Sequence, residues 1–308
     1  MTNRKLITLG TLLVIPTVCS VAFAQGEGDK HVLDALNALL AANTIECEIR
    51  IETFVDGKRH AATGRYEEQA LPQTASSQPA PFLRSMYRLE VSLMNATTAS
   101  SVERNRMILV CHPRTNDING QIERYVHVEG VKVFSTIDLT RLEQRLRRAS
   151  NMEAIFAQVS EVRNLGGLAG MMRQIRRFYE FSAPTFENLP DDETIPALKL
   201  TGQLRDDLHT DLLERFGGLD KRGRYPANFP SNVEIWIARH NDFPYEIRYL
   251  RRVSPTSERK EPLFQESFFN VQLNGAPIPA SRFAPLTPPE GVFSVQDDTN
   301  RVIRDLGL

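Results

Sequence analysis

Residues 44–54, TIECEIRIETF, indicate the fold class because their polarity alternates from one residue to the next. One face of such an extended chain holds the apolar side chains Ile45, Cys47, Ile49 and Ile51, and the other face holds charged ones. This period of two predicts a strand with one buried and one solvated face, which is typical of antiparallel sheets. The Asp56-Gly57 pair that follows is a hairpin signal, so residues 61–69, AATGRYEEQ, are interpreted as the return strand.

Similar strand patterns recur along most of the chain. They occur at 86–94, 106–112, 122–135, 197–205, 232–239, 245–252 and 263–273. Helical spacing of apolar residues is found at 31–42, around 210–218 and in a helical insertion at about 136–180. An antiparallel sheet of about ten strands cannot stay flat, so it must curl, split or close. The sequence therefore predicts an α+β, mainly β protein, in which helices cover the concave face of a curved antiparallel sheet.

The first 24 residues have the features of a cleavable signal peptide. MTNRK is a positively charged start, an apolar run follows, and Ala22-Phe23-Ala24 matches the small-x-small pattern that precedes a cleavage site, here between Ala24 and Gln25. An uncleaved membrane anchor and a lipoprotein acylated at Cys19 are the alternatives. The expected mature protein is one exported domain, residues 25–308, with no stable membrane span after cleavage.

Composition argues against several classes of function. Removing residues 1–24 deletes Arg4 and Lys5 and no acids, so the net charge moves from −1 to −3. A nucleic-acid-binding protein would normally have a basic surplus, so no nucleic-acid partner is expected. The histidines have no paired-ligand spacing, and no nucleophile elbow, P-loop or dinucleotide fingerprint is present. We therefore expect no catalytic residue, no metal and no cofactor, and a protein that is not an enzyme.

Cys47 and Cys111 would be the two cysteines of the mature chain. In an oxidising compartment an even pair is a candidate disulfide. Each also lies in a strand-like run where a buried free thiol is equally at home, so both interpretations stay open. Two arginine groups, at 141–148 and 173–177, fit either helix faces in solvent or an anionic membrane surface.

The carboxyl-terminal stretch FAPLTPPEGVFSVQDDT, residues 283–299 and here called the strap, combines three prolines with recurring apolar residues. Phe283, the run Thr287–Val292 and the acids Asp297-Asp298 resemble the closing motif of the LolA/LolB-like superfamily of periplasmic outer-membrane lipoprotein carriers. The preceding LFQESFFNVQLNGAPIPASRF and FPYEIRYLRR are similar to that family's last strands. Pro285 departs from the family pattern, which has an aromatic residue there.

This resemblance implies an incomplete, half-open β-barrel in the periplasm, with a helical lid and an apolar cavity that takes up lipoprotein acyl chains or other lipidic ligands. Its partners would be lipoproteins or lipids and an inner- or outer-membrane protein that releases or accepts the cargo. The expected cavity residues are Ile45, Ile49, Ile51, Tyr87, Leu89, Val91, Leu93, Leu109, Ile235 and Ile237. The strap should form the last sheet edge, with Phe283, Val292 and Phe293 plugging the barrel. The alternative is an envelope interaction or scaffold protein of the same fold with a filled core.

Overall fold

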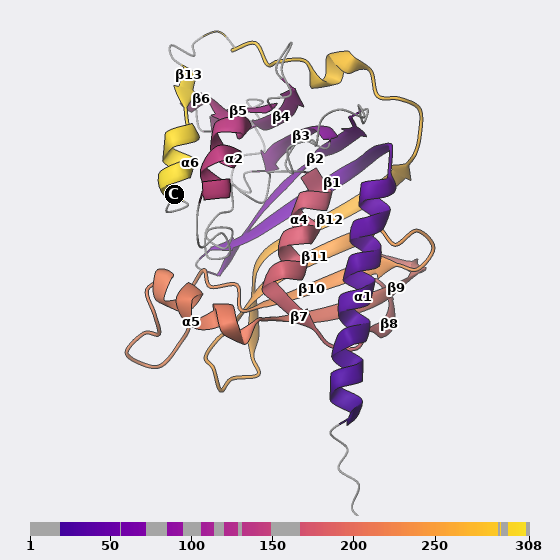
Figure 1. The fold of residues 1–308 in the computed structure, drawn as a ribbon, viewed down its shortest axis with the longest axis vertical. Helices are drawn as coiled ribbons and strands as arrows, with labels where there is room; N and C mark the ends of the chain where they lie inside the picture. The colour runs from indigo at the N-terminus through magenta and orange to yellow at the C-terminus, as the bar shows by residue number, and fades with distance from the viewer. Residues whose placement is uncertain are drawn as a thin grey trace, which may run out of the picture.

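The computed structural model describes residues 19–55, 57–71, 85–94, 106–113, 120–128, 131–148, 167–288, 290 and 295–305 (Figure 1). Its helices are α1 (Cys19–Ala41), α2 (Leu139–Arg148), α4 (Gly167–Phe178), α5 (Asp206–Arg215) and α6 (Thr299–Asp305), with a 3-10 turn η2 (Ala280–Phe283). Its strands are β1 (Thr44–Val55), β2 (Lys58–Ala70), β3 (Ser85–Met94), β4 (Arg106–Pro113), β5 (Gly120–Val128), β6 (Val131–Asp138), β7 (Tyr179–Phe181), β8 (Thr185–Leu189), β9 (Asp192–Leu204), β10 (Asn232–Ala238), β11 (Pro244–Arg252), β12 (Lys260–Leu273) and β13 (Val295–Asp297).

Within these residues the strands form one 13-stranded sheet in the order β13-β6-β5-β4-β3-β2-β1-β12-β11-β10-β9-β7, and β8 also pairs with β9. All pairings are antiparallel except that of β13, which runs parallel to β6. The sheet is curved, and its terminal strands β13 and β7 do not pair with each other (Figure 1). The expected mainly β, curved and incompletely closed sheet is confirmed.

Helices α1 and α4 lie across one face of the sheet, which we call the inner face (Figure 1). In α1 the buried residues Val32, Ala35, Leu36 and Leu39 recur at helical spacing, so one apolar stripe faces the strands. Gly28 brings α1 close to β7, because a Cβ atom there would lie only 2.1 Å from the carbonyl oxygen of Ser182. None of the described helices combines the length and apolar character needed to cross a membrane.

Several predicted boundaries shift. The helix expected at 31–42 is part of the longer α1, which runs without a break past the predicted cleavage position at Ala24 and Gln25, while residues 1–18 lie outside the described residues. The insertion expected at 136–180 contains α2 and α4, but its first residues belong to β6 and its last to β7. Residues 149–166 of that insertion also lie outside the described part.

The strap takes a different path from the one predicted. Its end, β13, is indeed an edge strand of the sheet. Leu286, however, packs on a cluster formed by Ile108, Val110, Tyr125 and Phe134, whose side chains point to the outer face, opposite α1 and α4. Phe283 is buried in η2, which contacts β3 and β4 on that same outer side. Phe283 was expected to plug the bottom of the barrel, but it lies outside the buried cluster of the inner face, so this expectation is wrong. Val292 and Phe293 lie outside the described residues.

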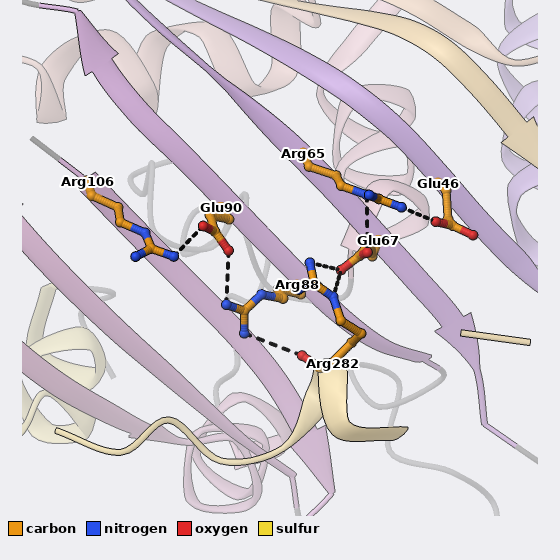
Figure 2. Close-up of polar contacts among 7 residues, drawn as sticks. All are labelled: Glu46, Arg65, Glu67, Arg88, Glu90, Arg106 and Arg282. Atoms are coloured by element: carbon orange, nitrogen blue, oxygen red, sulfur yellow. Dashed lines mark hydrogen bonds and ion pairs between the residues drawn. The ribbon is translucent and has the colours of Figure 1, made fainter. Parts of the chain in front are cut away.

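Polar side chains of the outer face fix this path (Figure 2). Arg282, the residue before the strap, donates to Glu67 of β2 through Nε at 2.9 Å and Nη2 at 2.7 Å. The guanidinium of Arg88 on β3 donates to the carbonyl oxygen of Arg282 at 3.4 Å. Figure 2 shows these groups within a row of alternating charges that also includes Glu46, Arg65, Glu90 and Arg106. The strap is thus attached to the charged side of the strands.

The candidate disulfide is absent, and the interpretation as free thiols holds. Cys47 and Cys111 are both buried and free. Cys47 lies on β1 and Cys111 on β4, with β2 and β3 between them. Three strand spacings of about 4.8 Å place their backbones well beyond the reach of a disulfide, which needs Cα atoms within about 7 Å. Burial raises the pKa of the Cys111 thiol to about 12, which keeps the thiol in its neutral form.

Candidate functional site

The inner face of the sheet is one continuous apolar surface. Alternate residues of neighbouring strands meet in cross-strand rows, one of which runs through Cys47, Tyr66, Leu89 and Leu109 on β1 to β4. Ile235 of β10 is paired with Ile247 of β11 on the same face. A fully buried aliphatic or aromatic side chain contributes roughly 1.5–3 kcal/mol. This face therefore supplies much of the stability of the fold and is its largest apolar surface.

The structure brings the predicted cavity residues together. Ile45, Ile49, Tyr87, Leu89, Val91, Leu109, Ile235 and Ile237 all belong to one buried cluster beneath α1 and α4. Ile51 is half-buried and packs against this cluster. Leu93 lies in β3 opposite Ala62, and its side chain is outside the described ones.

Helix α4 contributes an adaptable wall to this cluster. Its buried residues include Met171, Met172, Ile175 and Phe178, which belong to the main cluster, together with the small residues Ala169 and Gly170. Methionine side chains are flexible and polarisable, so they fit apolar partners of varied shape. At its carboxyl end α4 is anchored by the backbone N–H of Arg205, which donates to the carbonyl oxygen of Phe178 at 2.9 Å.

The amino end of α4 rests on a buried polar group that the sequence analysis missed. Tyr66 of β2 donates its hydroxyl hydrogen to Glu68 at 2.6 Å and accepts the backbone N–H of Leu168 at 3.1 Å. Ser85 of β3 also donates to Glu68. Gly167 completes the contact: its φ of +62° suits glycine, and a Cβ atom would lie 2.7 Å from both Tyr66 Oη and Glu68 Oε1. We call Tyr66, Glu68, Ser85, Gly167 and Leu168 the α4 latch.

Burial dominates the electrostatics of the α4 latch. It raises the pKa of Glu68, while the hydrogen bonds from Ser85 and Tyr66 act in the opposite direction. Burial also raises the pKa of Tyr66 well above its usual value. A carboxyl group on the apolar face of an alternating strand was the available signal, because Tyr66 and Glu68 are two residues apart and so share a face. Leu168, the backbone partner of Tyr66, lies 102 residues away from it in sequence, and local pattern does not reveal such a contact.

The described residues form no group of three or more His, Cys, Asp or Glu side chains placed to hold a metal ion. His112 is buried on the outer face, where its Nε2 lies 3.4 Å from a carboxylate oxygen of Glu123. The backbone N–H of Leu286 in the strap donates to the same carboxylate. These two polar groups thus contribute to holding the strap in place.

Comparison with solved structures gives distant likenesses. A DUF1329 family protein from Desulfovibrio piger is 9% identical with a TM-score of 0.35, over 85% of this chain and 97% of that one. The MucA/MucB complex of Pseudomonas aeruginosa contains a chain 13% identical, with a TM-score of 0.35, over 82% of this chain and 61% of that one. A LolA superfamily protein from Nitrosomonas europaea is 12% identical with a TM-score of 0.23, over 82% of this chain and 97% of that one. Scores this low assign no function to the chain.

No protein-family model matches the chain, and no curated protein matches it.

Proposed function

We propose that this protein is a periplasmic, non-enzymatic carrier or binder of lipoprotein acyl chains or other lipidic ligands. The ligand would lie between the inner face of the sheet and helix α4. The supporting observation is the continuous apolar cluster of the inner face, closed on one side by a methionine-bearing helix whose amino end is held through polar contacts with the sheet. Transfer of an acyl chain from water into such a site is favourable by about 0.8 kcal/mol per buried CH₂ group.

Helix α4 is the proposed moving part. Its contact with β2 at the amino end is the α4 latch, in which the hydroxyl of Tyr66 accepts the N–H of Leu168. Breaking this contact frees the amino half of α4, while the backbone bond from Arg205 still anchors its carboxyl end. Met171 and Met172 would then contact the ligand instead of the other residues of the cluster. No covalent step is needed for uptake or release.

The proposed partners follow from the chemistry of the site. Acyl chains in the envelope occur in lipids and lipoproteins, and a carrier of either must receive its cargo at one membrane and deliver it at another. The periplasmic location depends on the predicted signal peptide, and amino-terminal sequencing of the exported protein should begin at Gln25. A start at Met1 would contradict export by cleavage.

Mass spectrometry tests the proposal directly. The protein is purified from its native envelope without detergent, and native and denatured spectra are compared for a bound lipid or acylated protein. In parallel, anilinonaphthalene sulfonate is added and displaced by palmitate. A clean apo mass together with no palmitate-displaceable fluorescence refutes the proposal and favours the scaffold alternative with a filled core.

Two variants locate the bound ligand. Replacing Leu89 and Val91 by Asp adds charge to the inner face and should abolish uptake in molecules whose circular dichroism shows retained folding. If that variant does not fold, Met172→Gln alters the α4 wall instead. Ser92→Ala, also on β3 but turned to the outer face, is the matched control and should take up palmitate like the wild type.

A further inference from the structure

A cleft of about 360 Å³, lined by several polar side chains, lies at the ends of β9 to β12. Its lining includes Thr201 and Gln203 of β9, Asn232 of β10, Arg252 of β11 and Lys260 of β12. Thr201, Gln203 and Asn232 alternate with the inner-face residues Leu200, Leu204 and Val233. Leu204 of the inner cluster also lines the cleft, so the cleft lies at the end of the sheet and opens mainly on the outer face.

Two cations stand side by side in this cleft. Arg252 and Lys260 are directly paired across β11 and β12. Neither side chain forms an ion pair or hydrogen bond with another described residue, and the Nε of Arg252 is buried with no partner. Like charges directly opposite each other destabilise a sheet. An anion bound between them would remove this repulsion.

Neutral polar groups line the cleft beside the cations. Asn232 is 2% exposed, and its side chain is fixed because Oδ1 accepts the hydroxyl hydrogen of Ser231 at 3.0 Å and Nδ2 donates to Gly202 at 3.4 Å. The side chains of Thr201 and Gln203 are hydrogen-bond donors that lie nearby in the same lining. The cleft thus offers two positive charges next to neutral donors, as a multi-oxygen anion requires.

Two acidic residues, Glu180 and Asp206, also line the cleft. Glu180 of β7 is paired with Arg205 at 3.4 Å, which offsets its charge. Asp206 begins α5, next to His209. Burial lowers the pKa of His209; the charge of Asp206 opposes this shift, and that of Arg252 adds to it. The cleft therefore holds two cations and two acids, and the charge of one acid, Glu180, is already offset by Arg205.

We propose that this cleft binds the phosphate group of a small phosphate ester, with its oxygens between Arg252 and Lys260 and its alcohol portion against Asn232 and Gln203. A phosphate dianion matches two adjacent cations better than a single carboxylate does. The phosphate ester can be a soluble metabolite or the headgroup of a phospholipid. The site does not depend on the acyl-binding proposal, because Arg252 and Lys260 lie outside the buried apolar cluster.

Isothermal titration of the full chain with glycerol 3-phosphate tests the soluble source, and sedimentation with vesicles of phosphatidylglycerol and phosphatidylcholine tests the lipid source. Lys260→Gln should weaken whichever interaction is found by at least about tenfold, since it removes one charge-assisted contact. Lys58→Gln is the matched control, because Lys58 is an exposed lysine that also begins a strand. It should bind as the wild type does.

A stability measurement separates a binding role from a structural one. Without ligand, Lys260→Gln should melt at the same temperature as the wild type or higher, because the substitution relieves the repulsion with Arg252. Glycerol 3-phosphate or the vesicles should raise the melting temperature of the wild type and not that of the variant. Absence of binding to both probes, equal binding by Lys260→Gln, or a lower melting temperature of the unliganded variant would overturn the proposal.

Discussion

Tyr66→Phe tests whether the α4 latch controls the cover of the inner face. The substitution removes one hydroxyl, which donates to Glu68 at 2.6 Å and accepts from Leu168 at 3.1 Å, and keeps the ring in the cluster. Hydrogen bonds to charged or buried groups contribute about 1.5–3 kcal/mol each. The N–H of Leu168 retains Glu68 as a partner, so the expected loss is about 2 kcal/mol at the amino end of α4.

Native-state hydrogen exchange measures this loss where it occurs. A local cost of about 2 kcal/mol corresponds to a 10- to 100-fold faster exchange of the α4 amides, since each tenfold is about 1.4 kcal/mol. If α4 is the cover of an acyl site, uptake of anilinonaphthalene sulfonate should also become faster. The matched control is Tyr125→Phe, which makes the same chemical change in the outer-face cluster and should leave α4 exchange unaltered.

The effect of Tyr66→Phe should depend on pH. Burial raises the folded-state pKa of Glu68 above that of a free glutamate, so the folded protein holds this proton more tightly than the unfolded chain. The contribution to stability is complete below the ordinary range of glutamate and is lost as pH rises through the raised pKa. Because the Tyr66 hydroxyl favours the charged carboxylate, its removal should cost more at pH 8 than at pH 4. Equal α4 exchange in wild type and variant at both pH values would refute the α4 latch as a control point.

Two further predictions concern the outer face. Burial raises the pKa of Glu246 from 4.5 to about 6, so the wild-type free energy of unfolding should fall as pH rises through this range. The free energy of unfolding of Glu246→Gln, measured by urea titration with Trp236 fluorescence, should gain about 2 kcal/mol over the wild type between pH 4.5 and 7. A difference between variant and wild type that does not change with pH would contradict this prediction. Arg282→Gln removes both contacts to the buried carboxylate of Glu67. It should lower the unfolding free energy by about 1.5–3 kcal/mol and speed limited proteolysis within the strap. Unchanged proteolysis would show that Arg282 does not hold the strap.

The curved sheet and its inner face could be predicted from alternation, because a buried face imposes a period of two on every strand that it includes. The same reasoning placed Ile49 and Ile235 on one surface although they lie far apart in sequence. It did not determine the cover of the outer face. Yet β4 is apolar on both faces, with Leu109 inside and Ile108 and Val110 outside, and such a strand must be covered twice. That signal pointed to an outer-face cover, which is the strap.

The α4 latch was not predictable in the same way. A glutamate at position 68 breaks the apolar pattern of β2, but pattern alone does not reveal what satisfies it, since its partners come from β3 and from α4. The choice between a disulfide and two free thiols stayed open for a related reason. Pattern places both cysteines on strands, whereas their distance is fixed by the two strands that separate Cys47 from Cys111.

The path of the strap bears on how a ligand would enter. After η2, Leu286 of the strap covers the second apolar cluster on the outer face. Strand β13 then pairs with β6 at the sheet edge, and Val302 of α6 joins the main cluster on the inner side. Releasing Arg282 would expose the outer face and leave α4 on the inner face. Strap variants should therefore lower stability without changing probe uptake, whereas Tyr66→Phe should change both. A strap variant that opened the inner face to the probe would show that the two covers are coupled and would move the proposed entrance from α4 to the sheet edge.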